Sequence, residues 1–146
     1  MTRAGNLLWI AAPFLIGAAS PPRVEVRNLA AAGAFEIQVT GSPVSLATQA
    51  HMEKETADGW VTVATNLFLV EQCTKIAPPK CISVRSEAPL RPVPWTGYSC
   101  SGQCNHQCKK IVYLGPGNFR LTVFSCDRRE SFLGAPFRLP AAPPVR

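Results

Sequence analysis

Residues 23–40, which read RVEVRNLAAAGAFEIQVT, decide the fold. Apolar side chains occupy every second position at Val24 and Val26, and again from Phe35 to Val39, with charged or polar residues between them. This period-2 alternation is typical of strands that bury one face and expose the other. Two strands are therefore predicted here.

The following residues predict a hairpin. After a turn at 41–43, a third segment runs toward Asp58 and Gly59. An Asp-Gly pair between two strand-like runs is a strong hairpin signal, and residues 60–63 supply the returning strand. The composition of residues 47–57 also suits a short helix, but we favour a strand.

Short apolar runs separated by turn residues continue along the chain. Proline-rich residues 88–98 break regular pairing and predict an extended crossover. Residues 141–146 have no apolar pattern to bury and predict a loose tail. The further expected strand segments are 67–70, 82–84, 111–114, 119–126 and 132–139.

About seven to nine short strands with Gly/Pro turns and little helix predict an all-β domain, a small disulfide-stapled antiparallel β-sandwich. We place this domain at residues 20–140. Trp60 and Trp95 are expected core anchors, because large aromatic side chains dominate core burial. Residues 114–123 resemble the corner that enters a late strand in immunoglobulin-like and fibronectin-like domains, which implies an immunoglobulin-like arrangement. Those domains usually have Tyr where this chain has Phe119, so the hydroxyl bond of that corner is missing.

Residues 1–19 have the parts of a secretory signal peptide: a basic start at Arg3, an uncharged apolar run over 7–19, and small residues before Ser20. This run is shorter than the ~20 residues that a spanning helix needs, so an uncleaved membrane anchor is the less favoured alternative. The mature protein is therefore expected to be secreted or periplasmic, without a membrane contact.

The charge of the chain excludes few partners. Its formal net charge of +6 is spread along the sequence without a long block of like charges. The basic residues lack the interleaved aromatic pattern of a nucleic-acid surface, and export makes nucleic acid an improbable target. We expect no nucleic-acid partner.

All six Cys lie between Cys73 and Cys126, and an even number in an exported chain indicates disulfides. The expected disulfide residues are Cys73, Cys81, Cys100, Cys104, Cys108 and Cys126. Six Cys allow 15 pairings, among which the sequence alone does not choose.

Residues 73–81 read CTKIAPPKC. This segment resembles the reactive loop of the Bowman-Birk trypsin inhibitors, whose pattern is Cys-Thr-Lys/Arg-Ser-x-Pro-Pro-x-Cys, and six of its nine positions match. The resemblance implies that Cys73 and Cys81 bond to close a nine-residue ring. It also implies that Lys75 enters the specificity pocket of a trypsin-like serine protease, with Lys75-Ile76 as the reactive bond and a cis bond before Pro78.

The resemblance implies a contiguous protease-binding set, namely Thr74, Lys75, Ile76, Ala77, Pro78 and Pro79. Physical reasoning agrees, since a Lys held outward on a proline-stiffened ring loses less conformational freedom when it binds. Two positions depart from the family: Ile76 replaces a Ser whose hydroxyl bonds back to the Thr side chain, and Ala77 offers less contact area. The alternative is a purely structural loop whose residues follow ordinary turn preferences.

The remaining cysteines leave several pairings open. Three Cys spaced four apart and His106 could bind zinc or copper, but the usual Cys-x-x-Cys spacing is absent and an oxidising compartment favours bridges. We therefore expect no metal and no cofactor. A direct hairpin of 111–114 with 119–125 would make Cys108–Cys126 a plausible bridge and leave Cys100–Cys104, whereas strands in different sheets would make Cys100–Cys126 as plausible.

An enzyme is not expected. His51 and His106 are the only histidines, no motif of a serine hydrolase or a zinc protease occurs, and Glu53 and Glu55 share a strand face that we interpret as solvated. The leading hypothesis is a secreted inhibitor of trypsin-like serine proteases. The alternative is a non-catalytic extracellular binding or structural module whose disulfides serve stability only.

Overall fold

The computed structural model describes residues 17, 20–70, 79–99 and 110–142. The signal peptide predicted at 1–19 lies outside these residues except for Gly17, as do the last four residues of the predicted tail. Within the described part every regular element is a strand. The predicted all-β fold is thus confirmed, and the helix considered for residues 47–57 is wrong.

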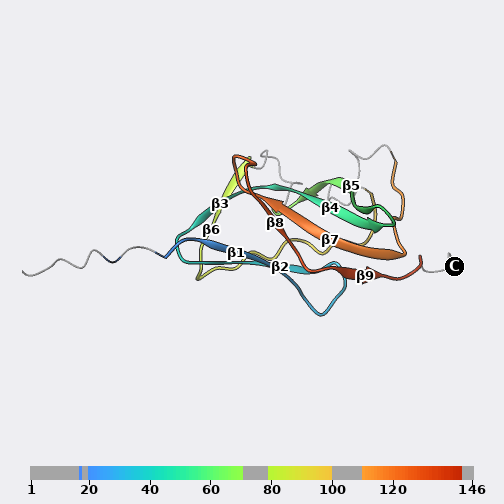
Figure 1. Cartoon of the computed structure of the whole chain (residues 1–146), viewed down its shortest axis with the longest axis horizontal. Coiled ribbons are helices and arrows are strands. Elements are labelled where there is room, and N and C mark those ends of the chain that lie inside the picture. Colours follow the sequence, from blue (N-terminus) through green and yellow to red (C-terminus); the bar gives the residue numbers. More distant parts are fainter. Residues whose placement is uncertain (1–16, 18–19, 71–78, 100–109, 143–146) are drawn as a thin grey trace, which may run out of the picture.

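The described residues form nine strands (Figure 1). They are β1 (Arg23–Asn28), β2 (Phe35–Thr40), β3 (Val44–Ala47), β4 (Gln49–Thr56), β5 (Gly59–Phe68), β6 (Cys81–Val84), β7 (Gly117–Phe124), β8 (Ser131–Leu133) and β9 (Phe137–Leu139).

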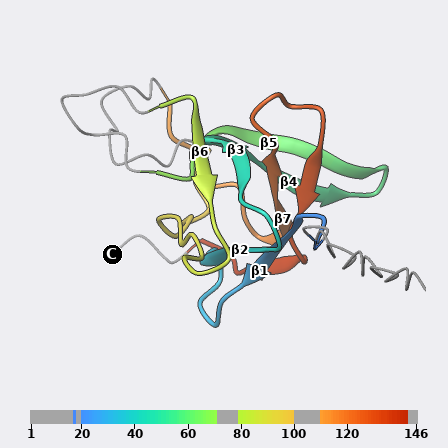
Figure 2. The same cartoon turned by 90° about the vertical axis from the view of Figure 1, so that its left-hand side faces the viewer.

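The strands pair antiparallel in three groups. The largest sheet has the order β5-β4-β7-β8, and β9 also pairs with β7. β1 pairs with β2, and Leu90 of the proline-rich crossover exchanges two backbone hydrogen bonds with Ile37 of β2. β3 pairs with β6 at one end of the molecule, where Figure 2 shows the two strands side by side.

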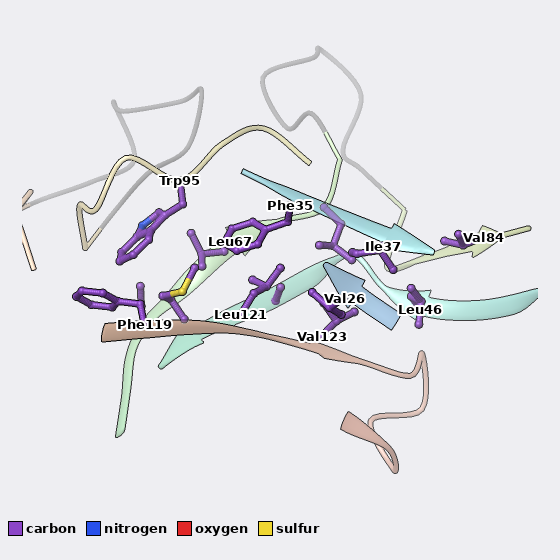
Figure 3. Close-up of a cluster of buried hydrophobic side chains, with 14 of the residues drawn as sticks. Val26, Phe35, Ile37, Leu46, Leu67, Val84, Trp95, Phe119, Leu121 and Val123 are labelled. Atoms are coloured by element: carbon purple, nitrogen blue, oxygen red, sulfur yellow. The ribbon is translucent and has the colours of Figure 1, made fainter. Parts of the chain in front are cut away.

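Apolar alternation explains which faces meet. In β2, Phe35, Ile37 and Val39 are buried, and in β7 Phe119, Leu121 and Val123 are buried. These faces lie toward each other and enclose the core (Figure 3). The two layers are therefore held together mainly by removal of apolar side chains from water.

Aromatic rings fill the end of the core that is nearest β9. Trp95 is 3 % exposed and its ring meets that of Phe119 edge to face, with centroids 5.1 Å apart. Phe35 and Phe137 make a similar pair at 5.3 Å. The expected core role of Trp95 is confirmed.

Several predicted strand boundaries are corrected. Residues 60–63 and 67–70 do not form two segments, because β5 runs continuously from Gly59 to Phe68. The segment predicted at 132–139 divides into β8 and β9. Residues 111–114 form no strand with β7; instead Tyr113 pairs with Tyr98 in a single bridge.

Candidate functional site

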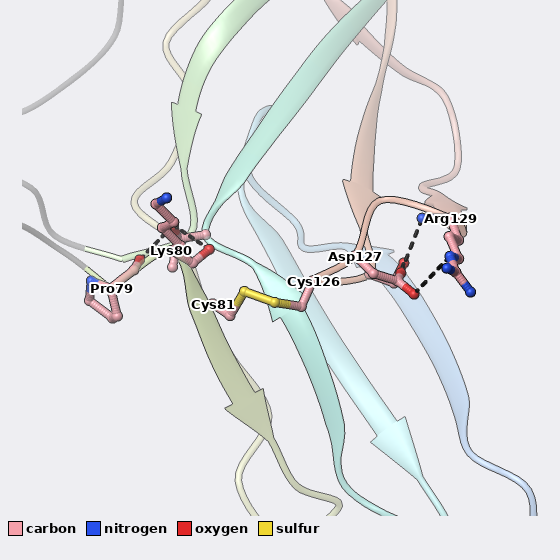
Figure 4. Close-up of a disulfide and its surroundings, with 8 residues drawn as sticks. Pro79, Lys80, Cys81, Cys126, Asp127 and Arg129 are labelled. Carbon is pink, nitrogen blue, oxygen red and sulfur yellow. Dashed lines mark hydrogen bonds and ion pairs between the residues drawn. A yellow bond between two sulfur atoms is a disulfide. The ribbon is translucent and has the colours of Figure 1, made fainter.

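The inhibitor-like segment connects β5 to β6. Of its nine positions the structure describes Pro79, Lys80 and Cys81, which lie just before and at the start of β6 (Figure 4). The other predicted site positions, Cys73, Thr74, Lys75, Ile76, Ala77 and Pro78, lie outside the described residues. Pro79 and Lys80 are exposed, so the described end of the segment is accessible to a partner.

Cys81 forms a disulfide with Cys126, with 5.5 Å between the two Cα atoms. The predicted ring between Cys73 and Cys81 is therefore wrong, because Cys81 has a different partner. The two alternatives for Cys126 are wrong for the same reason, since neither Cys108 nor Cys100 is bonded to it. Cys100, Cys104 and Cys108 themselves lie outside the described residues.

Strand pairing explains the observed bond. Cys81 is the first residue of β6 and lies opposite Ala47 of β3. The N–H of Cys126 donates a hydrogen bond of 2.9 Å to the carbonyl oxygen of Ser45, also on β3. Both cysteines are thus aligned by the same strand, and the bond links β6 to the turn that follows β7 (Figure 4).

The buried residue Thr48 makes hydrogen bonds to the chain just after β5 and just before β6. Thr48 lies between β3 and β4 and is 4 % exposed. Its carbonyl oxygen accepts a 2.7 Å hydrogen bond from the N–H of Leu69, and its own N–H donates a 3.0 Å bond to the carbonyl oxygen of Lys80. Its hydroxyl lies 2.9 Å from the carbonyl oxygen of Pro79 and 3.2 Å from that of Lys80.

The turn after β7 is a compact polar unit. The hydroxyl of Ser125 donates a 2.6 Å bond to Asp127 and accepts a 3.0 Å bond from the N–H of Glu130. The bond from Ser125 lowers the pKa of Asp127, and the N–H of Arg129 acts in the same direction. An open hollow beside the disulfide is lined by Ser45, Ser125, Cys126, Asp127, Arg129 and Glu130.

Arg128 of this turn has a φ of 57° and is exposed. A side chain is rarely stable in this left-handed region without supporting contacts. Its guanidinium lies 5.4 Å from the centroid of the Phe124 ring and donates a 3.0 Å hydrogen bond to Gln49. The turn that bears Cys126 is therefore braced against β4 and β7.

The outer face of the large sheet carries polar and aromatic groups in alternation. Glu53 accepts a 2.6 Å hydrogen bond from Arg120, whose guanidinium lies 4.4 Å from the centroid of the Trp60 ring. Trp60 is opposite Glu55 in the hairpin and is only half-buried. The prediction that Trp60 anchors the core is wrong, because the register of the hairpin directs it to the outer face.

The two glutamates that the sequence placed on one strand face do share that face. Glu53 pairs with Arg120, and Glu55 accepts a 2.7 Å bond from Asn118. The ring of His51, two residues before Glu53, meets that of Phe124 edge to face, with centroids 4.8 Å apart. The contacts of these side chains are those of a packed outer face, and the described residues contain no group of three or more His, Cys, Asp or Glu side chains able to hold a metal.

Thr48 is the site residue that sequence reasoning missed. It falls where the alternation of Val44, Leu46, Ala50 and Met52 predicts an apolar side chain, so a polar residue on the buried face was the one local signal that could have found it. The three residues that hydrogen-bond to Thr48 lie 21 to 32 positions further along the chain. Its role becomes visible only once the strands are paired.

No protein-family model, no curated protein and no solved structure matches the chain. No helix of the described residues is long and apolar enough to cross a membrane.

Proposed function

We propose that this protein is a secreted or periplasmic, non-catalytic inhibitor of trypsin-like serine proteases, with Lys75 as the specificity residue. The observation that carries the proposal is the covalent anchor at Cys81, which fixes the C-terminal end of the inhibitor-like segment to the β7–β8 turn. The sequence of that segment supplies the rest of the argument: a basic residue two positions after Cys73, followed by a Pro-Pro pair.

The proposed mechanism differs from that of the Bowman-Birk family in how the segment is held. A nine-residue ring would hold the reactive bond between two directly linked cysteines. Here the segment connects β5 to β6, and its described C-terminal end is held by the Cys81–Cys126 bond to the turn after β7. Ordering that is completed in the free protein does not have to be supplied by the protease contact, which favours binding.

A second candidate is a binding or structural module in which the disulfide serves stability only. The observation that favours it is the position of Cys81–Cys126, which joins β6 to the turn after β7, strands of two different sheets. Such a cross-link stabilises a small domain whether or not the adjoining segment has a partner.

A titration of trypsin with the oxidised mature protein separates the two candidates. The inhibitor proposal predicts that Lys75→Ala weakens inhibition about thirtyfold or more, because a desolvated specificity residue contributes roughly 2 kcal/mol or more. Lys110→Ala, which removes an exposed lysine elsewhere on the domain, is the matched control and should inhibit as the wild type does. Equal loss in both variants, or digestion of the wild type without inhibition, would leave the second candidate.

Two further variants test the assigned positions. Lys75→Leu should redirect inhibition from trypsin toward chymotrypsin-like enzymes, because the pocket reads mainly that side chain. Ile76→Ser should strengthen inhibition by restoring the hydroxyl contact to Thr74. A Lys75→Leu protein that still prefers trypsin would show that Lys75 does not occupy the pocket.

A further inference from the structure

β5 is the end strand of the largest sheet. The strand order is β5-β4-β7-β8, and among the described residues no strand pairs with the other side of β5 (Figure 1). Alternate residues of an end strand direct their backbone N–H and C=O groups away from the sheet, and such a row is a template for pairing with another chain. The free side of β5 is therefore a candidate binding edge.

β5 lacks the features by which sheet edges usually avoid such pairing. Its sequence, GWVTVATNLF, contains no charged residue and no proline. The opposite edge of the sheet is formed by β8 and β9, which have three residues each; Pro136 lies between them, and β9 carries the exposed Arg138. Because short strands, prolines and charges protect an edge, β5 is the less protected edge of this sheet.

One part of β5 is regular enough to pair again. Its pairing with β4 is continuous over Gly59–Thr62 and shifts register beyond it. Within this part Trp60 and Thr62 lie on the outer face of the sheet, whereas Val61, opposite Lys54, lies on the face that bears the core. Val61 is nevertheless 49 % exposed, so this edge presents an apolar, β-branched side chain to solvent.

We propose that the edge of β5 binds the same edge of a second copy of this chain, as an antiparallel pair about a two-fold axis at Val61. In such a contact the same residues face each other, so a charge on the axis would meet an identical charge. β5 carries none. The register places Val61 opposite Val61 of the second copy and Trp60 opposite Thr62, and cross-strand pairs of β-branched and aromatic residues are favourable.

A second copy supplies what the edge requires, since it is an extended, uncharged strand with its own unpaired backbone groups. The contact is narrow, so we expect a weak dimer with a Kd of roughly 100 µM. The formal net charge of +6 on each chain opposes approach. Salt screens that repulsion without weakening an uncharged contact, so the dimer should be tighter in about 0.5 M than in about 0.05 M NaCl.

Sedimentation equilibrium of the oxidised protein at about 10 µM to 1 mM measures the association. Val61→Lys and Val61→Glu should each weaken the dimer at least about tenfold, because each places like charges opposite one another. An equimolar mixture of the two variants should dimerise at least as tightly as the wild type, because opposite charges then meet on the axis. Leu133→Lys, at a 50 % exposed apolar position of β8, is the matched control and should dimerise as the wild type does.

The mixture distinguishes loss of pairing from loss of folding, since a variant that did not fold would not be restored by its partner. A wild-type protein that stays monomeric up to about 1 mM would overturn the proposal. So would a dimer that neither Val61 variant weakens, a loss that the mixture does not restore, or a dimer that salt dissociates. None of these outcomes involves trypsin, so this proposal and the proposed function are tested separately.

Discussion

Packing around His51, on the outer face of the large sheet, makes the stability of the protein depend on pH. Burial lowers its pKa, the charge of Arg128 lowers it further, and Glu53 acts in the opposite direction. The folded protein therefore keeps the imidazole neutral at pH values at which the unfolded chain protonates it. Since the unfolded chain takes up this proton below a pH of about 6.5, the free energy of unfolding should fall there.

We expect His51→Gln to reduce the decrease in the free energy of unfolding at low pH. Urea unfolding of wild type and variant at pH values of about 7 and about 5 measures the two free energies. The wild type should lose more stability than the variant over this interval. The same loss in both proteins would show that His51 is not responsible.

For single residues, the sequence predicted burial correctly at some positions and wrongly at others. The alternation in 35–39 identified Phe35, Ile37 and Val39 as buried, which they are. Trp60 was misplaced, because its size favours burial while the pairing of Gly59 with Thr56 turns it outward. Side-chain size indicates how much burial would contribute, but the register decides which face a residue occupies.

The small β3-β6 sheet is the element that joins the candidate segment to the rest of the domain. Its β6 strand begins at Cys81. On its β3 strand, the carbonyl oxygen of Ser45 accepts a hydrogen bond from the N–H of Cys126. The disulfide closes a span of 45 residues, and in the chain-entropy description a loop of that length contributes about 4 kcal/mol.

Replacing both cysteines, Cys81→Ser with Cys126→Ser, should therefore lower the free energy of unfolding by about 4 kcal/mol. Urea unfolding measures the difference. Ser83→Ala, at an exposed position of β6, is the control and should change stability by no more than about 0.5 kcal/mol. An unchanged unfolding midpoint for the double variant would contradict the assigned bond.

The disulfide could not be predicted from spacing. Cys73 is eight residues from Cys81 and Cys126 is 45 residues away, so the local pair looks more favourable in the sequence. What brings Cys126 near is the pairing of both cysteine-bearing segments with β3, a tertiary contact. The division of β8 from β9 at residues 134–136, in contrast, has a visible cause in Pro136.

Across the whole molecule, stability depends on the apolar contact between the two layers. Trp95, from the proline-rich crossover, closes this core against Phe119, and its indole N–H donates a 2.9 Å bond to the carbonyl oxygen of Tyr98. The other described tryptophan, Trp60, packs on the outer face under Arg120. The two tryptophans therefore lie on opposite sides of the same sheet.

Trp95→Ala should lower the free energy of unfolding by about 3–5 kcal/mol, as expected for a large buried aromatic side chain. Trp60→Ala, the matched substitution on the outer face, should cost about 1 kcal/mol. Thermal and urea unfolding of the two variants give the comparison. A larger loss for Trp60→Ala than for Trp95→Ala would contradict the described core.

The architecture of the molecule was easier to predict than its connections. Alternation and turn residues sufficed for an all-β domain, because each strand shows its buried face in its own sequence. The order of strands in the sheets depends on pairings between distant segments, such as Met52 of β4 with Leu121 of β7, which have no local signal. The hydrogen bonds of Thr48 to Leu69 and Lys80 and the Cys81–Cys126 bond also depend on such distant contacts.

The central claim is that the chain binds a trypsin-like protease through Lys75. Its most direct test is a calorimetric titration of the oxidised mature protein into trypsin whose catalytic serine has been replaced, so that digestion cannot interfere. We predict a one-to-one complex with a Kd of about 1 µM or tighter, weakened about thirtyfold or more by Lys75→Ala. No binding at concentrations of about 100 µM, by protein whose Cys81–Cys126 bond is intact by peptide mapping, would contradict the claim.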